Sequence, residues 1–171
     1  MKTTKKLFLL IVILMTSIGT YAQKFAYVDS DYILSKMPEF IQAEEKIDDF
    51  SKEWQSEIEL AYEEVEQMYR DYQSEQVLLT SEMKTKREEA IMEKEKSVQS
   101  LQQKYFGNNG DLYKKRQDLI KPIQDRIFDA VQQLAASNKY SIIFDASSDL
   151  IMLYSNPDLD KSDKVLELMG Y

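Results

Sequence analysis

The sequence predicts an α+β protein, mostly α, in which a long antiparallel coiled-coil helical hairpin stands on a small β body that oligomerises. Three observations lead to this fold class. Apolar residues follow a heptad pattern through residues 40–72, short β-prone segments lie near both ends, and helix breakers are rare, with 4 glycines and 3 prolines. Few breakers in a chain that is 30% charged are typical of long helices rather than of a loop-rich globule.

Residues 1–22 have the three parts of a secretory signal peptide. Three of the first six residues are lysines, an apolar run covers Leu7–Ile18, and Thr20 and Ala22 are the small residues of the expected cleavage site. The run of 12 residues is shorter than the roughly 20 that a membrane-spanning helix needs, although an uncleaved membrane anchor is the alternative. We expect cleavage after Ala22 and export to the periplasm, which leaves residues 23–171 as one domain.

The first part of the body is predicted in residues 24–37. Lys24–Val28 is short, apolar and rich in β-formers, which indicates a strand. Asp29–Asp31 offers N-cap side chains for a short helix with Tyr32–Leu34 on its apolar face. That helix must stop before Pro38, because the residue preceding a proline disfavours helical backbone.

A long helix is predicted from Pro38, since proline suits the first helical turn and Glu39 complements the positive end of the helix dipole. Apolar residues then recur at intervals of three and four, which indicates an a/d coiled-coil seam with one four-residue slip. The seam consists of Phe40, Ala43, Ile47, Phe50, Trp54, Ile58, Ala61, Val65, Met68 and Tyr72. A helix of this length, about 60 Å at 1.5 Å per residue, needs a returning partner rather than a compact core.

The hairpin tip has two candidate positions. A tip at Gly107–Gly110, the glycine cluster, would leave much of the outgoing seam unpaired, at ~1.5–3 kcal/mol per exposed apolar side chain. A tip near Thr80, which can cap a second helix from Glu82, balances the arms better. We therefore predict a hairpin over residues 38–137 with its tip near Thr80 and a kink at Gly107–Gly110, and the glycine cluster is the alternative tip.

The returning arm leads into the second part of the body, residues 138–171. Helix resumes at Asp111, and Pro122 should bend or restart it. Asn138–Lys139 should end this helix, and Tyr140–Phe144 is predicted to form a strand. After a turn over Asp145–Asp149, Leu150–Tyr154 should form another strand that makes a hairpin with it. A final helix is predicted over Lys164–Met169, capped by Asp160 or Ser162 and ended by Gly170.

The predicted sheet is too small to be stable alone, because three short strands expose their edges and most of their apolar side chains. Self-association through the sheet would cover both the edges and the side chains. The residues expected to form this oligomer body are Phe25, Tyr27, Ile142, Phe144, Ile151 and Leu153.

Charge and residue usage exclude several functions. The chain has 22 basic and 30 acidic residues, and removal of residues 1–22, with three lysines and no acidic residue, leaves a net charge of −11. Such a surface disfavours nucleic acid and anionic membranes. The chain has no cysteine and no histidine, and the sequence holds neither a glycine-rich phosphate loop nor metal-ligand spacing. We therefore expect no enzyme activity, no metal and no cofactor.

Apolar residues outside the seam are the candidate contacts for other proteins. Methionine and aromatic side chains suit variable apolar partners, because they adapt to many shapes. The candidates that would touch non-native chains are Leu60, Tyr62, Tyr69, Leu78, Leu79 and Met92. The alternative is that these side chains thicken the coiled-coil core.

The order of these elements resembles that of the Skp (OmpH-like) chaperone family. The resemblance rests on the signal peptide, the strand Phe25–Asp29, the long charged hairpin, the strand Ile142–Ala146 and the segment Asp158–Leu166. It extends over essentially all of the chain after residue 22, in short structural motifs whose combination is more specific than any one of them.

The resemblance implies a homotrimer whose β body carries three helical tentacles around a cavity, and ATP-independent binding of unfolded outer-membrane β-barrel proteins. Well-known members of the family are basic, which is thought to favour acidic clients and lipopolysaccharide, whereas this chain is acidic. The negative charge argues against binding to a membrane or to lipopolysaccharide. The alternative function is a structural or adaptor coiled-coil protein of the cell envelope with one specific protein partner.

Overall fold

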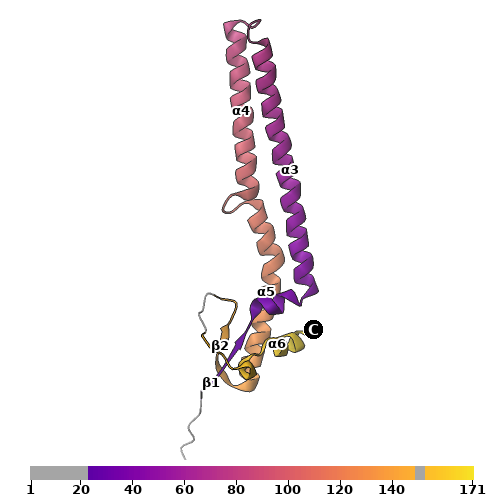
Figure 1. Cartoon of the computed structure of the whole chain (residues 1–171), viewed down its shortest axis with the longest axis vertical. Coiled ribbons are helices and arrows are strands. Elements are labelled where there is room, and N and C mark those ends of the chain that lie inside the picture. The colour runs from indigo at the N-terminus through magenta and orange to yellow at the C-terminus, as the bar shows by residue number, and fades with distance from the viewer. Residues whose placement is uncertain (1–22, 149–152) are drawn as a thin grey trace, which may run out of the picture.

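The computed structural model describes residues 23–148 and 153–171, and these form a long helical hairpin on a small body (Figure 1). The α+β, mostly α fold class is confirmed. The elements in chain order are β1 (Lys24–Val28), α2 (Ser30–Ser35), α3 (Pro38–Glu75), α4 (Ser81–Phe106), α5 (Asp111–Asn138), β2 (Tyr140–Asp145), the 3-10 turn η1 (Pro157–Leu159) and α6 (Ser162–Met169).

The outgoing arm of the hairpin is the single helix α3, which begins at Pro38 as predicted. Met37 before it has extended backbone, so the proline occupies the first helical turn, where its missing N–H is not needed. Each residue of the predicted seam is buried or half-buried. The heptad pattern therefore identified the face of α3 that packs against the returning arm.

The hairpin tip lies where α3 ends at Glu75 and α4 begins at Ser81. Thr80 caps α4, because its Oγ1 accepts a hydrogen bond from the backbone N–H of Met83 at 3.3 Å. The predicted tip near Thr80 is confirmed, and Gly107–Gly110 is a break within the returning arm. The alternative tip at the glycine cluster is excluded.

Glycine is required at both ends of this break between α4 and α5. A Cβ atom at Gly107 would lie 2.4 Å from the carbonyl oxygen of Gln103, and one at Gly110 would lie 2.7 Å from the carbonyl oxygen of Tyr105. Both neighbours are backbone atoms, which cannot move aside as a flexible side chain can. The two glycines therefore make the tight turn between α4 and α5 possible.

The sequence predicted that Pro122 bends or restarts the helix, and the restart is not found. The helix α5 runs from Asp111 to Asn138 with Pro122 inside it. A proline removes one backbone hydrogen bond, but Ile120, Ile123 and Ile127 around it are all buried in the base of the hairpin. Their packing outweighs the local preference for a break.

The sheet of the described residues has two strands, with β1 and β2 parallel and Phe25 opposite Ile142. The predicted strand over Leu150–Tyr154 is not formed at Leu153 or Tyr154, which have no regular structure and are 97% and 85% exposed. Side chains that stay this exposed gain too little burial to offset the entropy lost on ordering a strand. Ile151, and the rest of the segment 149–152, lies outside the described residues.

Hydrogen bonds fasten the two chain ends together in the body. Ser30 donates to Asp145 through both its backbone N–H (3.1 Å) and its hydroxyl (2.7 Å), and the backbone N–H of Asp29 donates to the hydroxyl of Ser162 at 2.9 Å. Burial raises the pKa of the Asp145 carboxyl, but hydrogen bonds from Ser30 and Ser147 outweigh burial and hold the pKa below its ordinary value.

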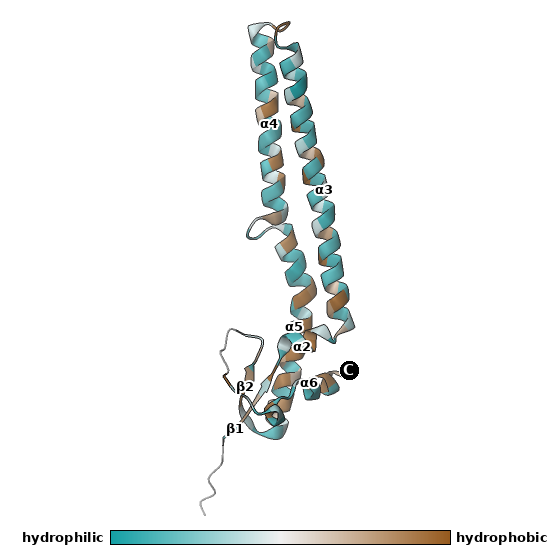
Figure 2. Cartoon of the chain, in the orientation of Figure 1, coloured by the Kyte–Doolittle hydropathy of each residue, from teal (hydrophilic) through white to brown (hydrophobic). Residues whose placement is uncertain are grey.

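Most of the buried apolar residues form two separate clusters, to which Ala26 and Ile91 do not belong. Along the arms in Figure 2, apolar residues are interspersed with longer hydrophilic stretches. The basal cluster joins the body to the lower parts of α3 and α5, with Met37, Ile47 and Val165 among its members. The distal cluster lies between α3 and α4 and is smaller, with Ile58, Val65, Val98 and Tyr105 buried. The upper arms are accordingly mostly hydrophilic, and a thin pair of helices has little interior in which to bury apolar side chains.

Candidate interaction surfaces

The outer face of the small sheet is an apolar surface, which we call the sheet face: Phe25, Tyr27, Ile142 and Phe144. Side chains alternate along a strand, so Ala26 and Val28 point inward and are 2% and 5% exposed. Phe25 is 40%, Ile142 47% and Phe144 38% exposed. The pairing of Phe25 with Ile142 and of Tyr27 with Phe144 brings these four predicted body residues together.

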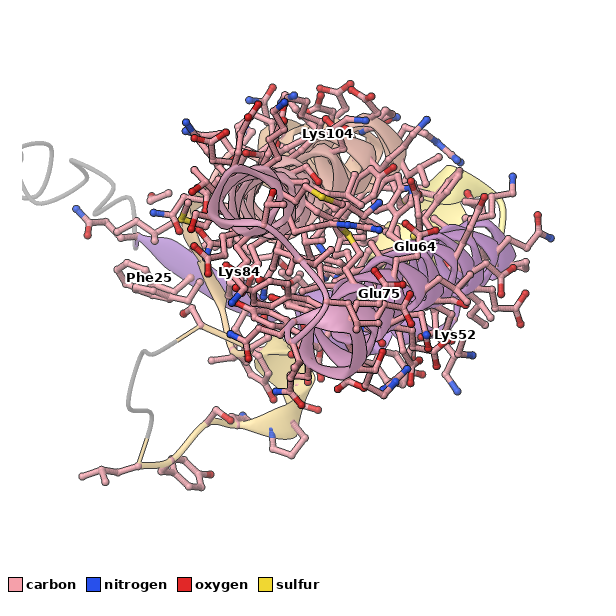
Figure 3. All side chains as sticks on the ribbon, turned by 90° about the horizontal axis from the view of Figure 1, so that it is seen from above. Phe25, Lys52, Glu64, Glu75, Lys84 and Lys104 are labelled. Carbon is pink, nitrogen blue, oxygen red and sulfur yellow. The ribbon has the colours of Figure 1, made fainter. Side chains whose placement is uncertain are left out.

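A shallow hollow adjoins the sheet face. It is lined by Phe25, Ala26, Tyr27, Phe144, Tyr154, Ser155, Asn156 and Leu159. Figure 3 shows Phe25 projecting from β1 clear of the helical hairpin. The other edge of β1 is covered in part, because the backbone N–H of Lys161 donates to the carbonyl of Tyr27 at 2.9 Å. The sheet face is therefore an apolar patch with no partner within the described chain.

The distal hairpin has two different flanks. On one, which we call the groove flank, Leu60, Ala61 and Glu64 of α3 and Lys94, Ser97 and Leu101 of α4 line a hollow between the arms. Ala61 and Ser97 are small, which leaves space above the buried Val98. Leu60 stands at the rim and is 58% exposed.

The other flank, the tyrosine flank, carries a row of hydrogen bonds from α3 to α4. The hydroxyl of Tyr69 donates to Glu95 at 3.1 Å, that of Tyr62 donates to Gln102 at 3.4 Å, and that of Tyr72 donates to Glu88. A fourth bond between the arms runs the opposite way, from Tyr105 of α4 to Glu57 of α3, at 2.7 Å. It belongs to the groove flank, because Glu57 also lines the hollow there. These contacts join the arms where apolar packing is thin.

The predicted client-facing residues therefore do not form one surface. Leu60 lies on the groove flank, whereas Tyr62 and Tyr69, 46% and 40% exposed, lie on the tyrosine flank with their hydroxyls bonded to the other arm. Met92 is 58% exposed on α4. These residues lie apart from one another, so the arms present separate contacts rather than one continuous stripe.

The tip presents a further apolar group. Leu78 is 85% exposed and Leu79 is half-buried. Both are among the predicted client-facing residues. Val77, 92% exposed, and Met83, 49% exposed, lie beside them and were missed. The run of apolar residues Val77–Leu79 between two charged helices was the signal that could have identified the whole tip.

The charge of the hairpin is divided unequally between its arms. The helix α3 has 13 acidic and 3 basic residues, a net charge of −10. The helices α4 and α5 have 5 and 4 acidic residues against 6 and 5 basic ones, so each has a net charge of +1. The outgoing arm therefore carries −10 of the net charge of −11 of residues 23–171.

Ion pairs between the arms follow this division. Arg87 and Lys94 of α4 pair with Glu75 and Glu64, and Arg116 and Arg126 of α5 pair with Glu44 and Glu39. Figure 3, looking along the hairpin, shows Glu64 and Glu75 on α3 and Lys104 on the returning arm. Exposed pairs of this kind contribute little stability each, but all of them favour the same pairing of an acidic arm with a neutral one.

Alkaline pH should destabilise the hairpin through its tyrosines. Hydrogen bonds to Glu95, Glu88 and Glu57 raise the pKa of Tyr69, Tyr72 and Tyr105 above the ordinary 10.0. A raised pKa means that the folded hairpin binds these protons more tightly than the unfolded chain, so their contribution is intact below pH 10 and is lost as the pH rises through the raised pKa values.

The measurement is the free energy of unfolding from urea titrations at about pH 8 and about pH 11. The control is the triple variant with phenylalanine at positions 69, 72 and 105, which keeps every lysine. Its free energy of unfolding should fall less between the two pH values than that of the wild type. Equal losses would show that lysine titration alone causes the alkaline effect.

Neither a metal centre nor a membrane helix is found in the parts of the chain that the structure describes. Within residues 23–148 and 153–171, histidine, cysteine, aspartate and glutamate do not gather in groups of three or more that could hold a metal ion. No helix in the same ranges combines the length and the hydropathy that crossing a membrane requires.

Comparison with known proteins agrees with this architecture. The sequence model of the family described as "Outer membrane protein (OmpH-like)" matches residues 24–169. Among solved structures, a candidate outer membrane chaperone (OmpH-like) from Caulobacter crescentus is similar with a TM-score of 0.69 and 13% sequence identity. The similarity covers 87% of this chain and 85% of that one, and at this identity it shows the fold alone.

Curated proteins gave no match to this chain. The family match is independent of the structural comparison, because it is made on sequence and extends from the first residue of β1 to the last residue of α6. It includes the sheet face, both arms and the tip. The chain therefore belongs to the OmpH-like family of outer membrane proteins.

Proposed function

We propose that the protein is an ATP-independent periplasmic holdase, which binds unfolded outer-membrane proteins between the helical arms of a homotrimer. Membership of the OmpH-like family and the likeness to a candidate chaperone support a chaperone role. The observation that carries the proposal is the hairpin itself. Two thin arms expose apolar side chains far from the basal cluster, where a stable globular domain would bury them.

In this proposal the sheet face is the contact between subunits. Phe25, Ile142 and Phe144 are large and partly exposed, and they lie at the end of the molecule from which the arms project. Association through these side chains removes apolar surface from water, at about 25 cal/mol per Å². It also places the hairpins of all subunits side by side around one cavity.

The arms then act as weak, repeated contacts for a client. Leu60, Met92, Val77 and Leu78 are spread along α3, the tip and α4, and each offers a small apolar area. Several arms that hold one chain raise the effective concentration of every contact, so binding is tight although each contact is weak. Weak contacts also permit release without a nucleotide.

The charge division has a role in the same assembly. Each α3 has a net charge of −10, so the outgoing arms of neighbouring subunits repel one another and favour an open cavity. The same charge disfavours lipopolysaccharide and anionic membranes. Apolar contact must therefore outweigh the repulsion between the arms and an acidic client, and the choice of client differs from that of basic relatives.

The test is an aggregation assay on several unrelated outer-membrane barrel proteins diluted from urea, without a nucleotide. The purified protein without residues 1–22 should keep all of them soluble at stoichiometric concentration. The fourfold variant with serine at positions 60, 77, 78 and 92 is the matched control, since it keeps the seam and should protect less. Protection of one client alone would favour an adaptor with a specific partner, and protection of none would refute the holdase.

A further inference from the structure

The hollow on the groove flank has an apolar floor that the distal cluster holds in place. Val98 of the floor is buried in that cluster, and Ala61 and Leu101 pack against it. Ala61 and Ser97 on either side are small, so the two helices leave room between them. Open hollows with an apolar lining are where proteins take up apolar groups of other molecules.

Leu60, at the rim of the hollow, is surrounded by carboxylates. Residues three and four positions apart are neighbours on a helix, which places Glu57, Glu63 and Glu64 around Leu60 on α3. Glu53 lies a further turn toward the base of the hairpin. A chain that inserts a side chain into the hollow past Leu60 therefore brings its neighbouring residues close to these acids.

The carboxylates of this part of α3 are of two kinds. Glu64 pairs with Lys94, and Glu57 accepts a hydrogen bond from Tyr105. Three others are exposed and, among the described residues, have neither an ion pair nor a side-chain hydrogen bond: Glu53, Glu59 and Glu63. We call these three residues the rim acids.

Positive charge near the hollow does not neutralise the rim acids. Lys94 is paired with Glu64, and the ammonium of Lys104 lies 4.7 Å from the centre of the Tyr105 ring. Lys96 and Glu93 line an adjoining hollow on α4, where their charges balance. The free charge around the groove is therefore negative and lies on α3.

We propose that the hollow binds an apolar side chain of an unfolded client, and that the rim acids select segments in which lysine or arginine stands beside that side chain. Burial in the hollow attracts any apolar segment. Charge decides between segments, because the rim acids attract a cation and repel a carboxylate. The long stems of lysine and arginine can also cover apolar surface such as Leu60 while their charged ends stay in water.

This inference rests on the proposed function, since it specifies which segments of a client the arms hold. It also removes a difficulty in that function. The net charge of −10 on α3 repels an acidic client as a whole, but a client of any net charge has stretches in which basic and apolar residues are neighbours. The arms hold the client at those stretches.

The test uses two unfolded peptides of equal length with the same apolar residues and the same fluorescent label. One carries lysine and the other glutamate at the remaining positions. Fluorescence anisotropy with the purified protein without residues 1–22 should give about tenfold tighter binding of the lysine peptide at low ionic strength. The difference should shrink in about 1 M salt, where the screening length is only ~3 Å. Equal affinities at low ionic strength would refute the proposal.

A pair of variants with the same net charge separates the rim acids from the charge of the whole protein. The rim variant carries Glu53→Gln, Glu59→Gln and Glu63→Gln. The matched control removes three exposed acids from the returning arm, with Glu89→Gln, Asp118→Asn and Asp129→Asn. The rim variant should lose most of the preference for lysine, and the control should keep it. Equal losses in both would show that net charge, and not the groove, makes the selection.

The variant Ser97→Phe tests the hollow itself, because the ring fills it without a change of charge. Both peptides should bind about tenfold more weakly. The matched control is Ser74→Phe near the tip, since Ser74 and Ser97 are both exposed and each hydroxyl donates to the carbonyl three residues earlier. This control should bind both peptides as the wild type does. Wild-type affinity in Ser97→Phe, with its helices intact by circular dichroism, would show that the hollow is not the site.

The aggregation assay of the proposed function gives a separate result. A protein that keeps barrel proteins soluble but binds the two peptides equally would refute the selection by charge alone. A protein that protects no client but prefers the lysine peptide through its rim acids would refute the holdase, and would leave the groove as a binding surface for basic, apolar segments.

Discussion

Replacing Phe144 with aspartate is expected to break the assembly into single chains and to abolish protection of clients, while the hairpin stays folded. Phe144 lies on the sheet face opposite Tyr27. Its side chain is 38% exposed in the single chain, so a carboxylate there is tolerated in water. In the proposed assembly the same carboxylate would be desolvated without a partner, which costs several kcal/mol for each subunit.

The measurement is the molar mass from light scattering, together with far-ultraviolet circular dichroism to confirm the helices. The matched control is Leu168→Asp on α6, since Leu168 is 44% exposed and lines a hollow with residues of α5 and α6 rather than of the sheet face. This variant should retain the wild-type mass. If Phe144→Asp also retains it, the sheet face is not the contact between subunits.

Replacing Val98 with aspartate should separate the two arms above the break at Gly107–Gly110. Val98 is 1% exposed and lies at the centre of the distal cluster, beside Ile58 and Val65. A buried carboxylate without a partner is among the most destabilising of substitutions. The cluster has few members, and a pair of helices offers no second layer that could compensate.

Amide hydrogen exchange measures this effect segment by segment. Protection should be lost over α4 and the distal part of α3 in Val98→Asp, whereas α5 and the body should keep theirs. The control is Met92→Asp on the same helix, where the side chain is 58% exposed and the exchange should match the wild type. Loss of protection throughout the chain would contradict the division of the core into two clusters.

Much of the fold could be predicted from the sequence, because the relevant signals are local. The prediction of the α3 seam depended on apolar periodicity, and the prediction of the tip depended on Thr80 as a helix cap. The break at Gly107–Gly110 rests on glycine. The strand Lys24–Val28 was found with its bounds. In each case a few neighbouring residues determine the outcome.

The parallel pairing of β1 with β2 could not be predicted in this way. It depends on how the antiparallel hairpin brings two distant segments together, and strands this short fit several arrangements. The predicted strand at Leu153 and Tyr154 failed for a related reason: β propensity describes a side chain that packs on a surface. Those side chains have no such surface in the single chain.

The candidate surfaces were predicted in part. Four of the five described members of the body set meet on the sheet face, whereas Leu153 does not. Tyr62 and Leu60 fell on different flanks, because the rotation of α3 about its axis is not visible in a list of off-seam residues. The cross-arm pairs did have a signal. Once the tip is placed, Tyr72–Glu88, Glu57–Tyr105 and Glu75–Arg87 are each centred within two residues of Ser81.

In the proposed assembly, several hairpins associate through their sheet faces and enclose one unfolded chain. Native mass spectrometry of the purified protein without residues 1–22, alone and with an unfolded outer-membrane barrel protein, tests it most directly. The account predicts a species of three chains that gains the mass of one client. A single chain whose mass the client does not change would contradict it.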